Sequence, residues 1–368
     1  MTNASLNCMA TPQRGWNHKA IPWFRWGVLV VAGLLAASTA ALAVHSIRLE
    51  ARLTSEQMRI NKITDLLVRT ESHLERLKVL EAYAGASQRV IAKVTPSIVF
   101  LQGAYRFIEP ESGKTLRYLG LGPDGQPLRN RFGQPFVTLA EEGPVIEMFY
   151  TGTAFVASYD GLLITNRHVA VPWEYDATAK AFIAQGLVPV MHRFVGYLAG
   201  IKEPFDVELV AASDQADVAV VQGHGLAGWV RPLTFSEASL KPGADVIVLG
   251  YPTGMRALLA RSDTTFVDQI TAGEEANFWT VAQQLSAAGR IDALATRGIV
   301  GHVSATAVVY DAETAGGGSG GPVVDLSGKV VAVNAAILPE FGGSNLGVPV
   351  QHVRELLASV RSAGNSND

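Results

Sequence analysis

Residues 314–325 read Thr-Ala-Gly-Gly-Gly-Ser-Gly-Gly-Pro-Val-Val-Asp and are the most informative stretch of this 368-residue sequence. A serine between glycines is typical of acyl transfer, because that chemistry needs an accessible hydroxyl beside two backbone N–H donors that stabilise developing oxyanion charge. Gly317 has no Cβ, so it can adopt a strained turn and present its N–H alongside that of Ser319. We therefore interpret Ser319 as a candidate nucleophile. A glycine-rich loop without chemistry is the alternative for this stretch taken alone.

Two upstream segments supply candidate partners for this serine. Residues 152–170 alternate apolar positions around an Asp-Gly pair, which predicts a β-hairpin with His168 just beyond its second strand. Asp217 stands at the start of a buried-looking strand, where a carboxylate is costly unless it accepts a hydrogen bond from an imidazole. The structural alternatives are a core role for His168 and a strand cap at Asp217. Asp214 is also close enough to compete with Asp217.

The order His168, Asp217, Ser319 along the chain is that of chymotrypsin-like enzymes. The motifs Thr-Asn-Arg-His-Val, Asp-Val-Ala-Val and Gly-Gly-Ser-Gly-Gly around these residues resemble those of the HtrA (high-temperature-requirement, Deg) family of trypsin-like serine proteases. One departure is Gly318, where that family usually carries Asn. Further segments that match the family are Pro96-Ser97-Ile98-Val99, Gly250-Tyr251-Pro252, Gly298-Ile299-Val300 and Val333-Asn334-Ala335-Ala336-Ile337.

The resemblance implies an all-β, chymotrypsin-like fold over residues 94–360. Two six-stranded antiparallel barrels, over about 94–225 and 230–350, are expected to flank a cleft that holds the triad. A helix over 350–360 is expected to close the domain. Short β-branched runs separated by Gly, Pro and Asp-Gly independently favour an all-β domain from Val94 onward.

The same resemblance implies a function for each site residue. His168, Asp217 and Ser319 are the expected catalytic triad, and the N–H groups of Gly317 and Ser319 are the expected oxyanion hole. No metal or organic cofactor is required. The candidates for the substrate pocket are Glu313, Thr314, Val333, Asn334 and Ala335.

Glu313 offers a hypothesis about specificity. It lies six residues before Ser319, where trypsin-type enzymes carry the acidic residue at the floor of the pocket. If its side chain reaches the pocket, Lys or Arg is favoured before the cleaved bond. A small aliphatic preference, as in HtrA relatives, is the alternative.

Composition excludes several classes of partner and site. The formal net charge is −3 and charged residues make up 17% of the chain. The chain therefore lacks the basic excess that would suggest a nucleic acid partner. Cys8 is the sole cysteine, which excludes disulfides in the exported part and a cysteine-rich metal site.

The N-terminal region predicts export. Residues 27–44 are an uncharged apolar run, interpreted as a transmembrane anchor over 27–47 that follows a cytoplasmic segment over 1–26. The expected location is the bacterial inner membrane, single-pass, with the protease domain in the periplasm. A cleaved signal peptide is the alternative, because Ala41-Leu42-Ala43 is an acceptable cleavage site, and it gives a soluble periplasmic protein.

Residues 48–93 predict a helical stalk. From residue 46 onward this region is rich in Arg, Glu and Leu without proline, which favours one long helix. Apolar residues alternate at spacings of three and four, with Glu56 and Thr70 as interruptions, which favours a coiled coil. The resemblance adds a homo-oligomer, a trimer in HtrA relatives. An amphipathic helix packed on its own domain is the alternative. The seam positions are Leu49, Leu53, Ile60, Ile63, Leu67, Leu74 and Leu77.

Two segments, 102–148 and 273–296, are predicted insertions that serve as gates, trimer contacts or surface decoration. The regulatory PDZ domain of HtrA relatives is expected to be absent, since only eight residues follow Val360. We expect a serine endopeptidase that acts on unfolded or specific proteins of the cell envelope, in quality control or regulated proteolysis. The alternative is a non-catalytic envelope protein that binds unfolded chains or a membrane partner through a protease-derived cleft.

Overall fold

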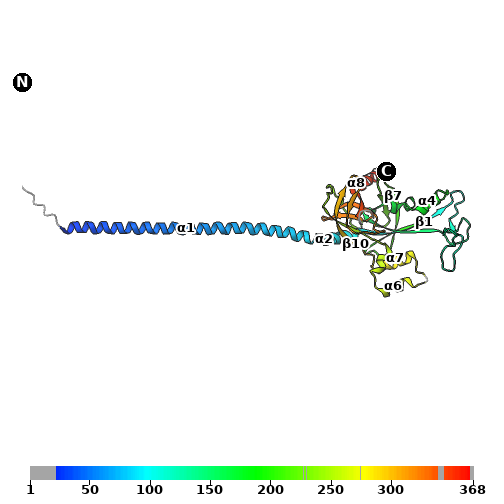
Figure 1. Cartoon of the computed structure of the whole chain (residues 1–368), viewed down its shortest axis with the longest axis horizontal. Coiled ribbons are helices and arrows are strands. Elements are labelled where there is room, and N and C mark those ends of the chain that lie inside the picture. Colours follow the sequence, from blue (N-terminus) through cyan, green and yellow to red (C-terminus); the bar gives the residue numbers. More distant parts are fainter. Residues whose placement is uncertain (1–21, 227, 229, 274, 339–343, 365–368) are drawn as a thin grey trace, which may run out of the picture. The chain divides into compact units, whose positions relative to one another are not determined.

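The computed structural model describes residues 22–226, 228, 230–273, 275–338 and 344–364. Two compact units are distinguished, Met1–Leu80 and Glu81–Asp368 (Figure 1). Cys8 and most of the expected cytoplasmic segment lie outside the described residues.

One continuous helix, α1 (Pro22–Ala84), contains both the apolar run and the expected stalk. Within the described residues it is the one helix long and apolar enough to cross a membrane. Its seam side chains are exposed, so nothing in the unit Met1–Leu80 covers them. The prediction of a single helix through residue 93 is wrong at Gly85, where α1 has ended and α2 (Ala86–Val94) begins. Glycine is a poor helix former, and α2 buries Val90 and Val94 in the core of the unit Glu81–Asp368.

The first barrel is closed by six antiparallel strands in the order β1-β4-β5-β8-β7-β6. The predicted hairpin is confirmed: β4 and β5 pair antiparallel, and Gly161 between them has a φ of +90°, which glycine adopts without strain. The strand bounds are β1 (Ile98–Ile108), β4 (Glu147–Val156), β5 (Leu162–Thr165), β6 (Val188–Leu198), β7 (Phe205–Ala212) and β8 (Ala219–Gly223).

The second barrel also closes with six strands, in the order β10-β11-β14-β13-β12-β9. It is followed by α8 (Val350–Gly364), the predicted closing helix. The expected double-barrel fold is therefore confirmed. The strand bounds are β9 (Asp245–Gly250), β10 (Leu294–Val303), β11 (Val308–Tyr310), β12 (Pro322–Asp325), β13 (Val330–Leu338) and β14 (Ser344–Pro349).

Alternation along the strands builds two kinds of core. In β1, Val99 and Leu101 belong to a hydrophobic cluster to which all six strands of the first barrel contribute side chains. This cluster fills the interior of the first barrel. The alternate residues Ile98 and Phe100 join a cluster that also contains Ile247 of the second barrel. This second cluster packs the barrels against each other.

The first insertion is shorter than predicted. Strand β1 continues to Ile108 and β4 already starts at Glu147, because inward residues such as Phe107 stay buried. Between them, residues 109–146 form tight turns and a two-stranded ribbon, β2 (Arg117–Tyr118) with β3 (Val137–Thr138).

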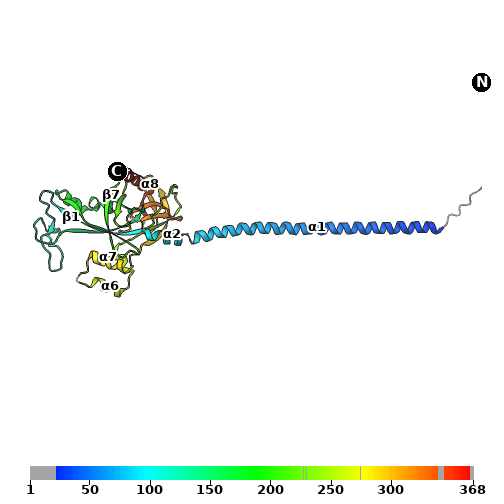
Figure 2. The same ribbon diagram turned by 180° about the vertical axis from the view of Figure 1, so that it is seen from behind.

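The second insertion is helical, as the spacing at 278–288 predicts, but it starts earlier than residue 273. It comprises α5 (Met255–Ala260), α6 (Thr264–Thr271) and α7 (Phe278–Ala287). In Figures 1 and 2, α6 and α7 lie on the side of the barrels opposite α8. Short helical segments complete the domain: η1 (Thr95–Ser97), α3 (Arg167–Ala170), η2 (Pro172–Glu174) and α4 (Ala177–Ile183).

Candidate active site

His168 lies in the one-turn helix α3, directly after β5. The end of β5 is fixed by Thr165, whose hydroxyl donates to the Thr153 carbonyl at 2.7 Å. The next residue, Asn166, is buried and its side-chain amide donates to the Asp217 carbonyl at 2.7 Å. These two hydrogen bonds hold the histidine and the aspartate segments in register.

His168 and Asp217 form a two-point contact. The ring Nδ1 of His168 lies 2.7 Å from Asp217 Oδ2, and the His168 backbone N–H donates to Oδ1 at 2.9 Å. The side chains are 26% and 28% exposed, so the pair is accessible from one side. A carboxylate on Nδ1 favours the tautomer with its proton there, which leaves Nε2 free to accept a proton.

Asp214, the competing carboxylate, has a different partner. Arg167 donates to its Oδ1 at 2.9 Å and also binds Glu174 and the Ser213 carbonyl. These acceptors raise the pKa of Arg167, with the Glu174 hydrogen bond as the largest cause. Arg167 thus fastens the loop before Asp217 to the histidine helix. Sequence reasoning missed this arginine, although it stands beside the histidine in the quoted motif.

Tyr175 is a second residue near the site that no sequence motif indicates. Its ring meets the His168 ring edge-on, with centroids 5.8 Å apart. Partial burial, followed by the charge of Asp217, raises the pKa of its phenol. Tyr175 therefore stays protonated near neutral pH and limits the orientations open to the imidazole.

Among the described residues, Thr153 of β4 makes the hydrogen bonds that hold the serine loop, residues 314–321, against the first barrel. Its backbone N–H donates to the Ser319 carbonyl at 2.9 Å, and its hydroxyl donates to the Gly317 carbonyl at 2.7 Å. Because the Thr153 carbonyl also accepts from Thr165, the structure brings the serine loop and the strand before His168 to the same residue.

The Ser319 hydroxyl donates to the Ala335 carbonyl at 3.2 Å. Within the described residues it makes no hydrogen bond to the His168 ring. The hydroxyl has one proton, so a hydrogen bond from Ser319 to the imidazole would replace the one to the Ala335 carbonyl.

Over residues 317–321 the backbone leaves two N–H donors without an acceptor in the described part of the chain. Gly317 has a φ of +93°, and a Cβ there would lie 2.7 Å from the Tyr251 carbonyl oxygen, so only glycine fits. The N–H groups of Gly318, Gly320 and Gly321 each donate to a carbonyl. Those of Gly317 and Ser319 have no acceptor among the described residues.

The candidate pocket residues differ in burial: Asn334 and Val333 are buried, whereas Glu313 is exposed. Asn334 is buried and holds the serine loop, since its amide donates to the Gly318 carbonyl at 2.9 Å and to Thr314 Oγ1 at 3.3 Å. Val333 belongs to the core between the barrels. Glu313 has an exposed side chain without a hydrogen-bond or ionic partner in the described part of the chain, and its carbonyl accepts from Thr296. Among the described residues, no three His, Cys, Asp or Glu side chains gather as a metal site would need.

Comparison with known proteins places this geometry in a family. The trypsin-like peptidase domain family matches residues 152–333. Serine protease PepD of Mycobacterium tuberculosis is 26% identical over 228 residues, which cover 59% of this chain and 42% of that protein. A probable periplasmic serine endoprotease, DegP-like, of Chlamydia pneumoniae is 26% identical over 282 residues, which cover 74% and 46%. The chain thus spans about half or less of the length of these relatives.

Two of the solved structures that are similar to this chain are structures of proteases. The active form of the Rv3671c protease from M. tuberculosis has a TM-score of 0.43 at 21% identity over 74% of this chain and 83% of that one. The HtrA-type protease AlgW with a decapeptide has a TM-score of 0.44 at 17% identity over 75% and 67%. With its double barrel and the match to the trypsin-like peptidase domain over residues 152–333, this chain is similar to the HtrA/DegP-type serine proteases.

Proposed function

We propose that the chain is a serine endopeptidase that hydrolyses peptide bonds of proteins in the bacterial cell envelope. The observation that carries the proposal is the His168–Asp217 pair on the barrel that is hydrogen-bonded to the Ser319 loop, a loop in which the Gly317 and Ser319 N–H groups have no acceptor among the described residues. Nucleophilic acyl transfer needs these three parts: an activated hydroxyl, an oriented base and oxyanion donors.

The mechanism follows from the hydrogen-bond donors and acceptors that the site leaves available. Ser319 Oγ attacks the scissile carbonyl while Nε2 of His168 takes its proton, and Asp217 stabilises the imidazolium through Nδ1. The N–H groups of Gly317 and Ser319 stabilise the tetrahedral oxyanion. His168 then protonates the leaving amine, and a water molecule deprotonated by His168 hydrolyses the acyl-enzyme.

Casein digestion and labelling of the purified full-length protein by a fluorophosphonate test this proposal. Digestion together with labelling at Ser319 supports it. The second candidate function is a non-catalytic protein that binds unfolded chains, which the hydrogen bond from Ser319 to Ala335 rather than to His168 favours. Binding of casein without cleavage or labelling would select that second function.

Gly317→Ala tests the oxyanion hole. A methyl group at this position meets the Tyr251 carbonyl and must shift the Gly317 N–H, so kcat is expected to fall by about 10²–10³-fold. Gly316→Ala is the matched control, because a Cβ there meets nothing within 4 Å. Steady-state kinetics on a peptide substrate measure both variants. Equal losses in the two would contradict a specific role for Gly317.

The expected assembly is a membrane-anchored homo-oligomer held by the seam of α1. Ile60 lies on the seam and is 55% exposed, whereas Met58 lies off it and is 62% exposed. Ile60→Lys is expected to shift the full-length protein in detergent toward smaller species in sedimentation equilibrium, since a buried lysine opposes coiled-coil packing. Met58→Lys should leave the distribution unchanged. A monomeric wild-type protein would refute the coiled coil.

A further inference from the structure

One face of β4 connects the helical insertion to the serine loop. Side chains alternate along a strand, so Phe149, Thr151 and Thr153 lie on the same face of the barrel wall. Phe155, on the same face, belongs to the cluster between the barrels, which shows that this face points away from the barrel interior. The row therefore faces the second barrel and its insertion.

Each residue of this row contacts a different part of that region. Thr153 donates to the Gly317 carbonyl and accepts from the Tyr251 N–H at 3.0 Å. Thr151 packs on the turn before α5, since a Cβ on Gly254 would lie only 2.3 Å from its hydroxyl. From Thr153 toward Phe149, β4 therefore contacts first the serine loop and then the turn before α5.

Phe149 completes the row at α7. Its ring centroid lies 4.9 Å from that of Phe278 and 6.3 Å from that of Trp279. Buried Gln102, the partner of Thr151 in the β1–β4 register, donates to the Phe278 carbonyl. The guanidinium of Arg193 lies 4.5 Å from the Trp279 ring centroid. Three strands of the first barrel therefore fix the beginning of α7.

The insertion reaches back to the oxyanion donors through the turn at residues 251–254. Thr253 has a φ of +57° and is the one non-glycine residue with positive φ in the described part of the chain. A β-branched residue in this region is strained. Its N–H donates to the Gly316 carbonyl, and a Cβ on Gly317 would lie 2.9 Å from the Gly254 nitrogen.

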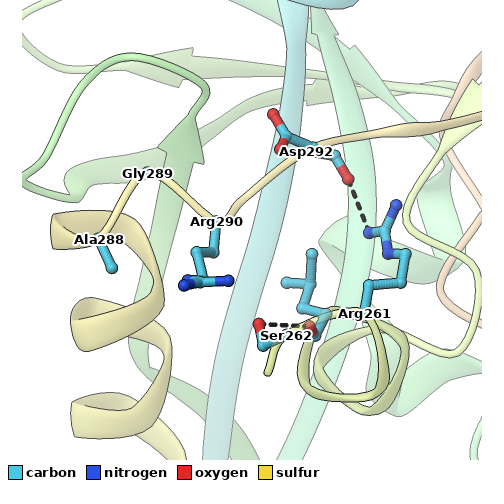
Figure 3. A pocket seen from close by; sticks show the side chains of 7 residues that line it. Arg261, Ser262, Ala288, Gly289, Arg290 and Asp292 are labelled. Carbon is cyan, nitrogen blue, oxygen red and sulfur yellow. Dashed lines mark hydrogen bonds between the residues drawn. The ribbon is translucent and has the colours of Figure 1, made fainter. Parts of the chain in front are cut away.

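Each helix of the insertion contributes to the cluster between the barrels. Leu258 of α5, Ile270 of α6 and Leu285 of α7 belong to it together with Tyr251. Arg261, after α5, also donates to the Asp292 carbonyl at 2.7 Å, which ties α5 to the segment that follows α7 (Figure 3). Packed side chains and this hydrogen bond thus connect α7 to the turn that contacts Gly317.

We propose that Phe149 is a positioning residue for the oxyanion hole. By docking α7 on the first barrel it keeps the strained Thr253 turn against Gly316 and Gly317, and so holds the Gly317 N–H in its catalytic orientation. The inference rests on the proposed function but adds a residue outside the triad, and it gives the second insertion a positioning role.

Phe149→Ala in the full-length protein tests this. Because oxyanion donors act on the transition state, kcat is expected to fall about tenfold with KM changed less than about twofold. Phe149→Tyr, which keeps the ring, should restore kcat. Phe132→Ala is the matched control, since Phe132 is 73% exposed and lies in the other insertion. A rise in KM alone would assign Phe149 to substrate binding and overturn the proposal, as would unchanged kinetics.

Hydrogen exchange gives a readout that does not depend on activity. Phe149→Ala is expected to speed amide exchange in residues 314–319, with Phe132→Ala and Phe149→Tyr like the wild type. Unchanged exchange in this segment would overturn the inference while leaving the proposed function intact. Should the wild-type protein neither cleave nor become labelled, the proposed function fails, and the exchange result still decides whether Phe149 controls the loop.

Discussion

Ser319→Ala is expected to lower kcat/KM for peptide hydrolysis by about 10⁴-fold or more, because the nucleophile is removed and only binding and oxyanion donors remain. The folded structure should persist, since the Ser319 hydroxyl makes a single hydrogen bond, to the Ala335 carbonyl. Initial rates on a fluorogenic peptide measure the loss, and thermal unfolding measures the fold. The same variant should no longer react with a fluorophosphonate.

A matched serine controls for the substitution itself. Ser327 lies in the turn after β12, and its hydroxyl bonds to Asp325. Ser327→Ala is therefore expected to retain the wild-type rate and labelling. If Ser319→Ala were labelled as strongly as the wild type, the reactive serine would lie elsewhere and the triad assignment would be wrong.

Local sequence patterns predicted much of this fold for a physical reason. The β4–β5 hairpin is specified by alternation and by a turn glycine within twenty residues, so it needs no knowledge of distant contacts. The same holds for the closing helix α8 and for the helical spacing in α7. Each of these elements is determined by its own residues.

The features that sequence reasoning missed depend on contacts between distant segments. Asn334 is a predicted pocket residue, and the sequence does not show that its amide also donates to the Gly318 carbonyl across the serine loop. The spacing before Val218-Ala219-Val220 favours Asp217 over Asp214 as the partner of His168, but it does not show what Asp214 contacts. In the structure Arg167 binds Asp214. Strand β1 extends beyond its predicted end because Phe107 is buried in a cluster with Leu116 and Ile146 of the insertion and Ala179 of α4.

The break at Gly85 is a similar case. The composition of residues 46–93 favours a helix throughout, but Gly85 weakens it locally and Val90 and Val94 are buried in the protease domain, so α2 is a separate element. A helical sequence pattern alone does not show where tertiary packing divides one helix into two. Propensity is therefore a weaker determinant here than tertiary packing.

Asp217→Asn is expected to reduce kcat by about 10⁴-fold with little effect on KM, because Asp217 fixes the His168 tautomer. Two donors, the His168 N–H and Nδ1–H, point at the two carboxylate oxygens, at 2.9 and 2.7 Å. An amide offers one oxygen only. If its NH₂ faces Nδ1, the ring proton moves to Nε2 and the base is lost; if it faces the backbone, two donors oppose each other.

Asp214→Asn is the matched control for this prediction. Asp214 is 92% exposed and binds Arg167 at the surface, where an ion pair contributes about 0–1 kcal/mol. Arg167 keeps its contact with Glu174, so the loop before Asp217 should stay in place. We expect kcat within about twofold of wild type for this variant, because a surface pair of that strength has little influence on the imidazole. A large loss in Asp214→Asn together with a small one in Asp217→Asn would reverse the assignment, and equal small losses would show that His168 needs no carboxylate partner.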